Sequence, residues 1–287
     1  MIEAAVRPSG PYSLRLSCRL AGDATRTLAE GVLTAAVHGA EGPELVTARQ
    51  LPDGAIRLTG ATSDGIERLC SCLGVHDDHG PFLRRFRNDP LIGPSVRILH
   101  GLRPPRVATV AQSLLRALCG QLIQSSRARE IERAVVRAAA PTVGTSRLRL
   151  PPGCDDLGRF STAELRRLGL HARRAAVLVR ICRSIDLERL RDLPTEAVAA
   201  RLGRERGLGP WSVGVICLQG LGRRERGLEG DLGLIKLLGE LRGRPAEPWE
   251  TAELLEPYGE WAGLASVYLL AGYGRGLVPL PAPRKAA

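Results

Sequence analysis

The chain has 287 residues, of which 25% are charged and 44% are hydrophobic. This balance excludes wholesale disorder, and the length is sufficient for two domains with buried cores. The formal net charge of +11 points to a polyanionic partner, for which nucleic acid is the commonest choice. Only Lys236 and Lys285 are lysines, so almost all of the positive charge is arginine.

The first residues carry no apolar run of the signal-peptide kind, and no segment reaches the roughly 18 uninterrupted apolar residues of a membrane span. We therefore expect a soluble cytoplasmic protein, monomeric and without a membrane partner. The seven cysteines are odd in number and scattered, which indicates small core residues in a reducing compartment.

The first part of the chain has the pattern of a small sheet. From Tyr12 to Leu20 apolar and polar residues alternate, and a period of two predicts a half-buried strand. We expect residues 1–88 to form an α+β domain, an antiparallel sheet with helix cover. Its other elements are β-like runs at Gly31–Val37, Glu44–Ala48 and Ala55–Leu58, separated by turn signals, and a helix from Asp64 to Leu73.

Cys70, Cys72, His76 and His79 lie close together in sequence and raise the question of a zinc site. One residue separates the two cysteines where zinc-binding pairs usually have two to four, and on a helix they would point about 200° apart. We therefore expect no metal here, but a buried cysteine and solvent-facing histidines at a helix end.

After Asn88-Asp89-Pro90 the chain becomes helical, and residues 89–276 are expected to form an all-α region. Apolar residues recur at three- and four-residue spacing from Val107 to Gln124. Further helices are predicted at Arg129–Ala140, after the capping box Ser161-Thr162-Ala163-Glu164, and at Ala172–Ile185. Residues 277–287 are expected to be a disordered tail.

The most informative stretch runs from Leu202 to Leu238. Gly207-Leu208-Gly209 predicts a sharp turn between two helices, because glycine adopts positive φ at little cost. Pro210 suits the first turn of the second helix. The unpartnered N–H groups of such a helix start offer a seat for a phosphate, so a DNA backbone could dock there; a plain helix–turn–helix connection is the alternative.

Downstream, Asp231 stands at the mouth of a third predicted helix. The helix dipole and free N–H groups favour its ionised form. A carboxylate so placed could stabilise an oxocarbenium-like sugar or orient an attacking water. An ordinary N-cap aspartate is the alternative interpretation.

These motifs resemble those of the helix-hairpin-helix DNA glycosylases, and among them the bacterial 3-methyladenine DNA glycosylase II group. The resemblance rests on Gly207-Leu208-Gly209-Pro210-Trp211-Ser212, on Asp231-Leu232-Gly233-Leu234, and on two further stretches. These are Gly101-Leu102-Arg103-Pro104 leading into Leu118-Cys119-Gly120-Gln121-Leu122, and Tyr258-Gly259-Glu260-Trp261. It is strong from about Pro90 to Tyr273 and suggestive before that.

The resemblance implies roles for particular residues. Asp231 would be the catalytic carboxylate, and Gly207, Leu208, Gly209 and Ser212 would form the DNA-binding hairpin. Trp211 and Trp261 would be walls of the base pocket, with core packing as the alternative for both. Gln121 or Leu122 would be the wedge that fills the vacated base stack, although Leu122 also lies on an apolar stripe and could be core.

Two absences bear on the mechanism that the resemblance implies. Relatives that also cut the backbone carry a lysine where Trp211 stands, and an iron–sulfur cluster would need four cysteines after the hairpin, whereas the last cysteine is Cys217. We therefore expect a monofunctional enzyme without cofactor, acting on double-stranded DNA in a bacterial cytoplasm or nucleoid and releasing a damaged base to leave an abasic site.

Two departures affect the expected substrate. Arg206 stands where a proline commonly precedes the hairpin, and Val215 stands where enzymes for alkylated bases often have an aromatic residue. An alkylated base is the expected substrate, with hypoxanthine or another lesion as the alternative. A non-catalytic helix-hairpin-helix DNA-binding protein is the competing function.

Overall fold

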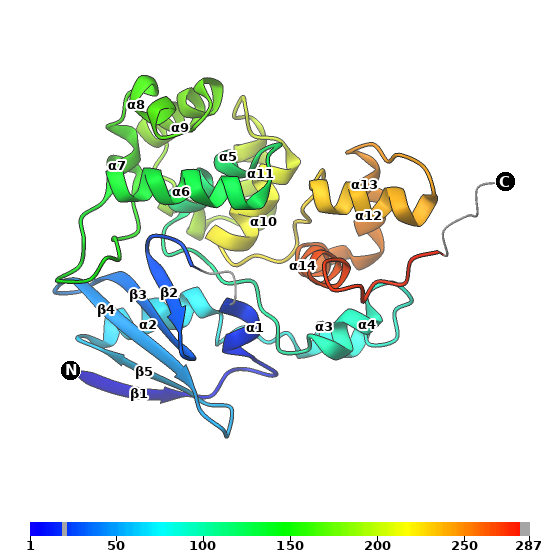
Figure 1. Ribbon diagram of the computed structural model, residues 1–287, viewed down its shortest axis with the longest axis horizontal. Helices are drawn as coiled ribbons and strands as arrows, with labels where there is room; N and C mark the ends of the chain where they lie inside the picture. The colour runs from blue at the N-terminus through cyan, green and yellow to red at the C-terminus, as the bar shows by residue number, and fades with distance from the viewer. Residues whose placement is uncertain (19–21, 282–287) are drawn as a thin grey trace.

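The computed structural model describes residues 1–18 and 22–281. It shows a five-stranded antiparallel sheet near the N-terminus, followed by a larger set of helices (Figure 1). The spatial order of the strands is β1-β5-β4-β3-β2. Their bounds are β1 (Ile2–Val6), β2 (Arg26–Ala29), β3 (Val32–Gly39), β4 (Gly42–Gln50) and β5 (Ile56–Gly60). The three predicted β-like runs are thus confirmed, as is the helix after them, α2 (Ser63–Leu73).

The strand predicted from Tyr12 to Leu20 is wrong in the part that the structure describes. Leu14–Cys18 form a short helix, α1, and residues 19 and 20 lie outside the described part of the chain. Leu14 and Cys18 are both buried, and a spacing of four residues fits a helix as well as a strand. The local hydrogen bonds decide between them, since Ser13 Oγ accepts from the N–H of Leu16 and Gln50 Oε1 accepts from that of Leu14.

The helices follow α2 without interruption by further strands in the described residues. α5 and α6 lie above the sheet, and α12, α13 and α14 gather on the other side of the helical part (Figure 1). Their bounds are α3 (Gly80–Arg85), α4 (Gly93–Ile98), α5 (Val110–Gly120), α6 (Ser125–Ala139), α7 (Cys154–Gly158), α8 (Thr162–Arg167), α9 (Ala172–Ser184), η1 (Glu188–Asp192), α10 (Thr195–Gly203), α11 (Pro210–Val215), η2 (Ile216–Gly220), α12 (Leu232–Arg242), α13 (Glu250–Leu255), η3 (Glu256–Trp261) and α14 (Ala262–Tyr273).

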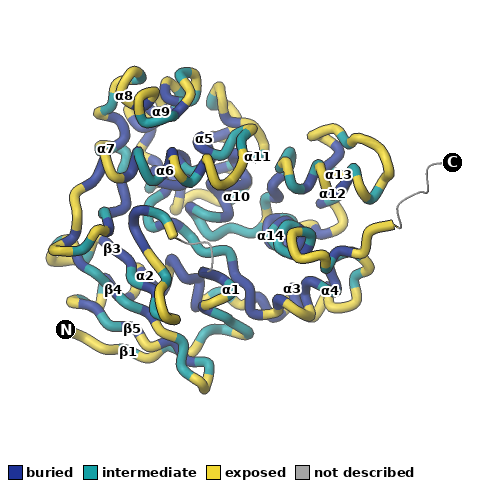
Figure 2. The backbone as a smooth tube through the Cα atoms, viewed as in Figure 1, coloured by how far each residue is buried: buried dark blue, intermediate teal, exposed yellow. Residues whose placement is uncertain are grey.

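Two main hydrophobic cores underlie these parts. One lies between the sheet and α2 and ends at Val75; the other fills the helical part and takes in Phe82, Leu83 and Phe86 (Figure 2). The helical core therefore begins before the expected domain boundary at residue 88. It also reaches the start of the expected tail, since Val278 is buried, while residues 282–287 lie outside the described part.

Buried charges join the two parts. Arg116 on α5 donates to both carboxylate oxygens of Glu132 on α6 and to Asp23 Oδ2, and Asp23 also pairs with Arg26 on β2. Burial alone would raise the pKa of Asp23, but Arg26 and Arg116 outweigh it and hold that pKa below its ordinary value. The ionised network is thus matched charge for charge, and its loss would leave uncompensated charge in the interior.

We expect Asp23→Asn to lower the free energy of unfolding by about 3 kcal/mol at neutral pH, because the change leaves Arg116 and Arg26 short of a buried counter-charge. Urea denaturation measures this. Asp53→Asn is the matched control: Asp53 pairs with Arg7 on the surface, and its loss should change the free energy by less than about 0.5 kcal/mol.

The effect should also depend on pH in one direction. Because the pKa of Asp23 is lowered on folding, its stabilisation is present above the unfolded value of about 4 and is lost as the pH falls through the folded value. The difference between wild type and Asp23→Asn should therefore shrink in acid. An equal difference at pH 3 and pH 7 would contradict the charge explanation.

Candidate functional site

The predicted hairpin is present between α10 and α11, and its shape depends on one glycine. Gly207 has a φ of +99°, and a Cβ there would lie 2.6 Å from Val177 Cγ2 on α9. Only glycine fits this conformation at this distance. Leu208 points inward and is buried, while Gly209 and Pro210 are exposed. The turn thus presents backbone outward and fixes itself to the core through one leucine.

The start of α11 has no side-chain cap in the described structure. Gly209 is the N-cap residue, Pro210 has no N–H to donate, and a Cβ on Gly209 would meet open space. Ser212, which was expected to contact DNA, has a buried side chain whose hydroxyl accepts a hydrogen bond from Gln121 Nε2 at 3.0 Å. Because the side chain is buried, a contact of Ser212 with an anion in solution would use its backbone N–H.

The two wedge candidates lie where α5 ends, beside the hairpin. Gln121 Nε2 donates to the carbonyl oxygen of Gly207 at 2.9 Å as well as to Ser212 Oγ, so this side chain ties the end of α5 to the turn. Leu122 is 80% exposed and has a φ of +53°. The interpretation of Leu122 as a core residue of a helix running to Gln124 is wrong, because α5 ends at Gly120.

Asp231 is held at the N-cap of α12 by donors from two directions. Oδ1 accepts from the N–H groups of Gly233 at 2.8 Å and Leu234 at 3.4 Å, which is ordinary capping. Oδ2 accepts from the indole Nε1 of Trp211 at 2.9 Å. The carboxylate is only partly buried and is thus positioned without being enclosed.

Trp211 therefore links the hairpin helix to the acid. Its indole packs over Gly120, where a Cβ would lie 2.6 Å from Trp211 Cη2. The only sequence signal for this contact was a glycine, Gly120, inside the helix predicted to run to Gln124, and no sequence signal pointed to the hydrogen bond with Asp231. The structure brings together Gly120, Gln121, the hairpin, Trp211 and Asp231.

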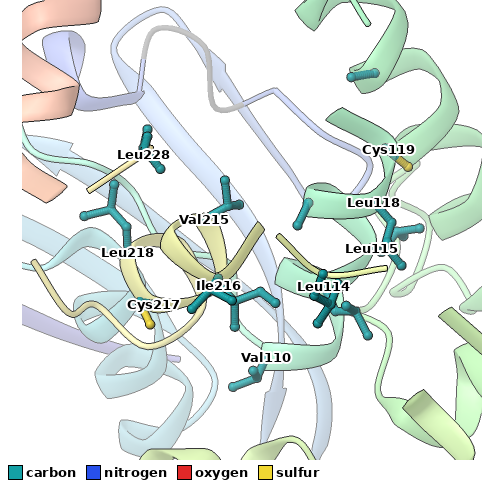
Figure 3. Close-up of a cluster of buried hydrophobic side chains, with 14 of the residues drawn as sticks. Val110, Leu114, Leu115, Leu118, Cys119, Val215, Ile216, Cys217, Leu218 and Leu228 are labelled. Atoms are coloured by element: carbon teal, nitrogen blue, oxygen red, sulfur yellow. The ribbon is translucent and has the colours of Figure 1, made fainter. Parts of the chain in front are cut away.

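Trp261 does not form an open wall in this structure. It is 5% exposed, the guanidinium carbon of Arg224 lies 3.9 Å from the centre of its ring, and Phe82 packs at a centroid distance of 5.8 Å. Core packing, the alternative interpretation, describes Trp261 correctly. Val215 is likewise buried in the helical core, close to residues of η2 and α5 (Figure 3).

The cysteines near the end of α2 and the histidines that follow it differ in part from the expectation. Cys70, Cys72 and also His79 are buried, whereas His76 is exposed. Burial, followed by the nearby charge of Arg103, lowers the pKa of His79 to about 4, so this histidine is neutral at pH 7. The atoms of Glu67, Cys70 and His76 that could bind a metal lie within 4.8 Å of one another, and burial, with Glu67 next, raises the pKa of Cys70 to about 12, which keeps its thiol protonated.

A glycine hairpin beside a capped aspartate on a helical scaffold is the arrangement that the resemblance to the helix-hairpin-helix DNA glycosylases predicts, and solved structures of DNA glycosylases share the fold of this chain. The 3-methyladenine DNA glycosylase from Archaeoglobus fulgidus superposes with a TM-score of 0.78 at 18% identity, over 95% of this chain and 98% of that chain. The 8-oxoguanine glycosylase/lyase of Clostridium acetobutylicum, in complex with double-stranded DNA, gives 0.78 at 16% identity, over 96% and 99%.

The chain is also similar to a curated protein. Over 206 residues the chain is 24% identical to a DNA-3-methyladenine glycosylase of Bacillus subtilis, covering 68% of this chain and 67% of that protein. No protein-family model matches the chain. The resemblance inferred from the sequence is thus confirmed, and the 95% of the chain matched by the archaeal structure is too much to leave out the N-terminal sheet of residues 2–60.

The backbone of Leu122 leads to a prediction about stability. A non-glycine residue in the left-handed region costs about 1 kcal/mol or more, and an 80% exposed side chain returns little of this by burial. Leu122→Gly should raise the free energy of unfolding by up to about 1 kcal/mol, whereas Leu122→Ala should leave it nearly unchanged. Thermal unfolding of both variants tests the strain; a glycine variant less stable than the alanine variant would refute it.

Proposed function

We propose that this protein is a monofunctional DNA glycosylase that hydrolyses the N-glycosidic bond of a flipped, alkylated base in double-stranded DNA and leaves an abasic site. The observation that carries the proposal is the Trp211–Asp231 hydrogen bond, which fixes a partly exposed carboxylate beside the hairpin. The names of the relatives agree with this activity, since they include 3-methyladenine DNA glycosylases.

Each step of the proposed reaction has a residue. A stacked base is out of reach, so its nucleotide must be turned out of the duplex at a cost of a few kcal/mol. The uncapped start of α11 after Gly209 binds a backbone phosphate, and Leu122 enters the gap that the base leaves. The exposed side chain and strained backbone of Leu122 fit a residue that contacts DNA in the complex and has nothing to pack against in the free protein.

Asp231 then acts on the sugar. As the bond to the base breaks, positive charge develops at the anomeric carbon, and a fixed carboxylate stabilises it without having to reorganise. Three N–H donors already orient this carboxylate. Water then attacks the anomeric carbon on the face opposite the departing base. Alkylated bases are good leaving groups, which fits a site with one acid and no dedicated proton donor.

The base pocket is proposed more narrowly than the sequence suggested. Trp211 is half-buried and beside Asp231, so it remains a wall candidate, whereas Trp261 is covered by Arg224 and is not assigned to the pocket. Val215, which stands where an aromatic residue was expected, is buried in the core. The free protein therefore presents fewer aromatic rings to a base than a pocket for a cationic base would use. Hypoxanthine therefore belongs in the lesion panel beside alkylated purines.

The remaining assignments are proposals of the same kind. The sheet with α1 and α2 forms one domain, and the helical core forms another. The protein acts as a monomer without a cofactor, in the bacterial cytoplasm or nucleoid. No helix within residues 1–18 and 22–281 is both long and apolar enough to cross a membrane.

The activity is tested with duplexes that each carry a single lesion. Wild-type protein should release an alkylated base, and Asp231→Asn should slow release about 100-fold or more, because it removes the charge that offsets the developing cation. Asparagine is as good an N-cap as aspartate, so α12 should remain folded. Base release is measured by chromatography of the free base under single-turnover conditions.

Glu229→Gln is the matched control for this experiment, since it removes a carboxylate two residues away and should leave the rate unchanged. An Asp231→Asn protein that releases base at the wild-type rate would defeat the assignment of Asp231. Binding of DNA by wild type without release from any lesion would support the non-catalytic alternative.

The absence of a lysine at the site predicts the product. Among the described residues the single lysine is Lys236, whose ammonium lies 5.9 Å from the ring centre of Tyr273 on α14. Without an amine at position 211 no Schiff base forms with the sugar. Reacted DNA should stay intact until treated with alkali, and borohydride should trap no covalent complex. Strand cleavage by the purified protein alone would show that the mechanism is wrong.

A further inference from the structure

The turn that precedes α9 repeats the design of the hairpin. Gly169-Leu170-His171 leads into α9 as Gly207-Leu208-Gly209 leads into α11, and both first glycines have a φ of +99°. Both leucines are buried, and both glycines face a neighbouring side chain so closely that a Cβ would press on it, Ile131 in one case and Val177 in the other. The helical part therefore contains a second helix–turn–helix of the same construction.

This second turn is densely basic on both sides. Arg166 and Arg167 end α8, Arg173 and Arg174 begin α9, and the only acid from Ser161 to Arg174 is Glu164. Glu164 already accepts from the N–H and hydroxyl of Ser161 in the capping box. In the described part of the chain, Arg166, Arg173 and Arg174 take part in no ion pair, although nearby Arg127 and Arg180 pair with Glu130 and Glu205.

The position of two of these arginines opposes helix stability. The N-terminal end of a helix carries partial positive charge and favours acids, yet the first turn of α9 contains no acid and carries Arg173 and Arg174. Four cations around one turn also repel one another. Such an arrangement becomes favourable when a polyanion lies against it.

This basic turn lies next to the proposed DNA-binding elements. Val177 contacts Gly207, and Arg174 precedes Val177 by three residues, or about 4.5 Å along the helix. Arg127, five residues after Leu122, lies with Nη2 3.5 Å from the Cβ position of Gly169. Figure 1 shows α8 and α9 along the same upper edge of the helical part as the turn before α11, and Figure 2 shows exposed residues there.

We propose that Arg166, Arg167, Arg173 and Arg174 form a second phosphate-binding surface, which contacts the duplex beyond the hairpin and steadies it while Leu122 enters the stack. The surface takes the DNA backbone of any sequence, because guanidinium groups around a turn contact phosphates and not base edges. The assignment rests on the proposed function only in taking duplex DNA as the partner. It does not depend on base release.

The test is the salt dependence of binding to an undamaged duplex, measured by fluorescence anisotropy between about 50 and 200 mM salt. Each phosphate contact contributes about 0.9 to the slope of log affinity against log salt. Arg173→Gln combined with Arg174→Gln should reduce that slope by about 1 to 2 and weaken binding equally for damaged and undamaged DNA. The lysine double variant, which keeps both charges, should retain most of the slope.

Arg84→Gln combined with Arg87→Gln is the matched control. Both residues are exposed, in or just after α3 at the opposite edge of the molecule, and take part in no ion pair in the described residues, so the slope should not change (Figure 1). Circular dichroism establishes that each variant is folded. An unchanged slope in the folded α9 glutamine variant, or an equal fall in the control, would overturn the proposal.

This experiment separates the two proposals, because it never measures catalysis. A reduced slope in a protein that releases no base would leave the second surface standing and reject the glycosylase function. Base release with an unchanged slope would do the reverse.

Discussion

The hydrogen bond from Trp211 Nε1 to Asp231 Oδ2 is the contact on which the arrangement of the site depends. It joins the first turn of α11 to the N-cap of α12, two helices separated by η2 and by the connection from Leu221 to Gly230. The indole reaches this position because Gly120 leaves room for it at the end of α5. One side chain therefore sets the positions of the hairpin, the end of α5 and the carboxylate relative to one another, and a change at Gly120 would affect Asp231 through Trp211.

The strain at Leu122 follows from the same arrangement. Gln121 is bonded to the hairpin through Gly207 and Ser212, and α6 begins at Ser125, so only a few residues reverse the chain direction. A positive φ at Leu122 completes the reversal and points the side chain outward. The two helices on either side are held by the Arg116–Glu132 pair, which is buried and also bound to Asp23. The fold thus supports a locally unfavourable conformation with a rigid base, as is common at functional sites.

Sequence patterns identified features that are local. The hairpin, the capping box at Ser161 and the N-cap position of Asp231 depend on residues within one or two turns of each other, and all are present. Features set by distant partners could not be predicted in this way. The burial of Trp261 depends on Phe82 and Arg224, the Trp211–Asp231 bond spans 20 residues, and Leu14–Cys18 satisfy both periods equally. The error with the largest effect on the site was the predicted end of the helix. Because α5 ends at Gly120, Leu122 lies on the surface and not in the core.

The positions of the proposed contacts suggest how the two sides of the site share the work. The hairpin, the basic turn before α9 and Leu122 all belong to the group of helices from α5 to α11, whereas Asp231 begins α12, which packs on α13 and α14. The connection to Asp231 is fixed on that second side, since Leu228 N–H donates to Ser266 Oγ, Gly230 N–H to Thr251 Oγ1, and Gly263 N–H to the carbonyl oxygen of Arg224. One group of helices would then hold the duplex while the other holds the acid still. Because Trp211 bridges the two groups, DNA bound by the first group would meet a carboxylate that is already in place. In the proposed reaction, little reorganisation would then be needed when charge develops on the sugar.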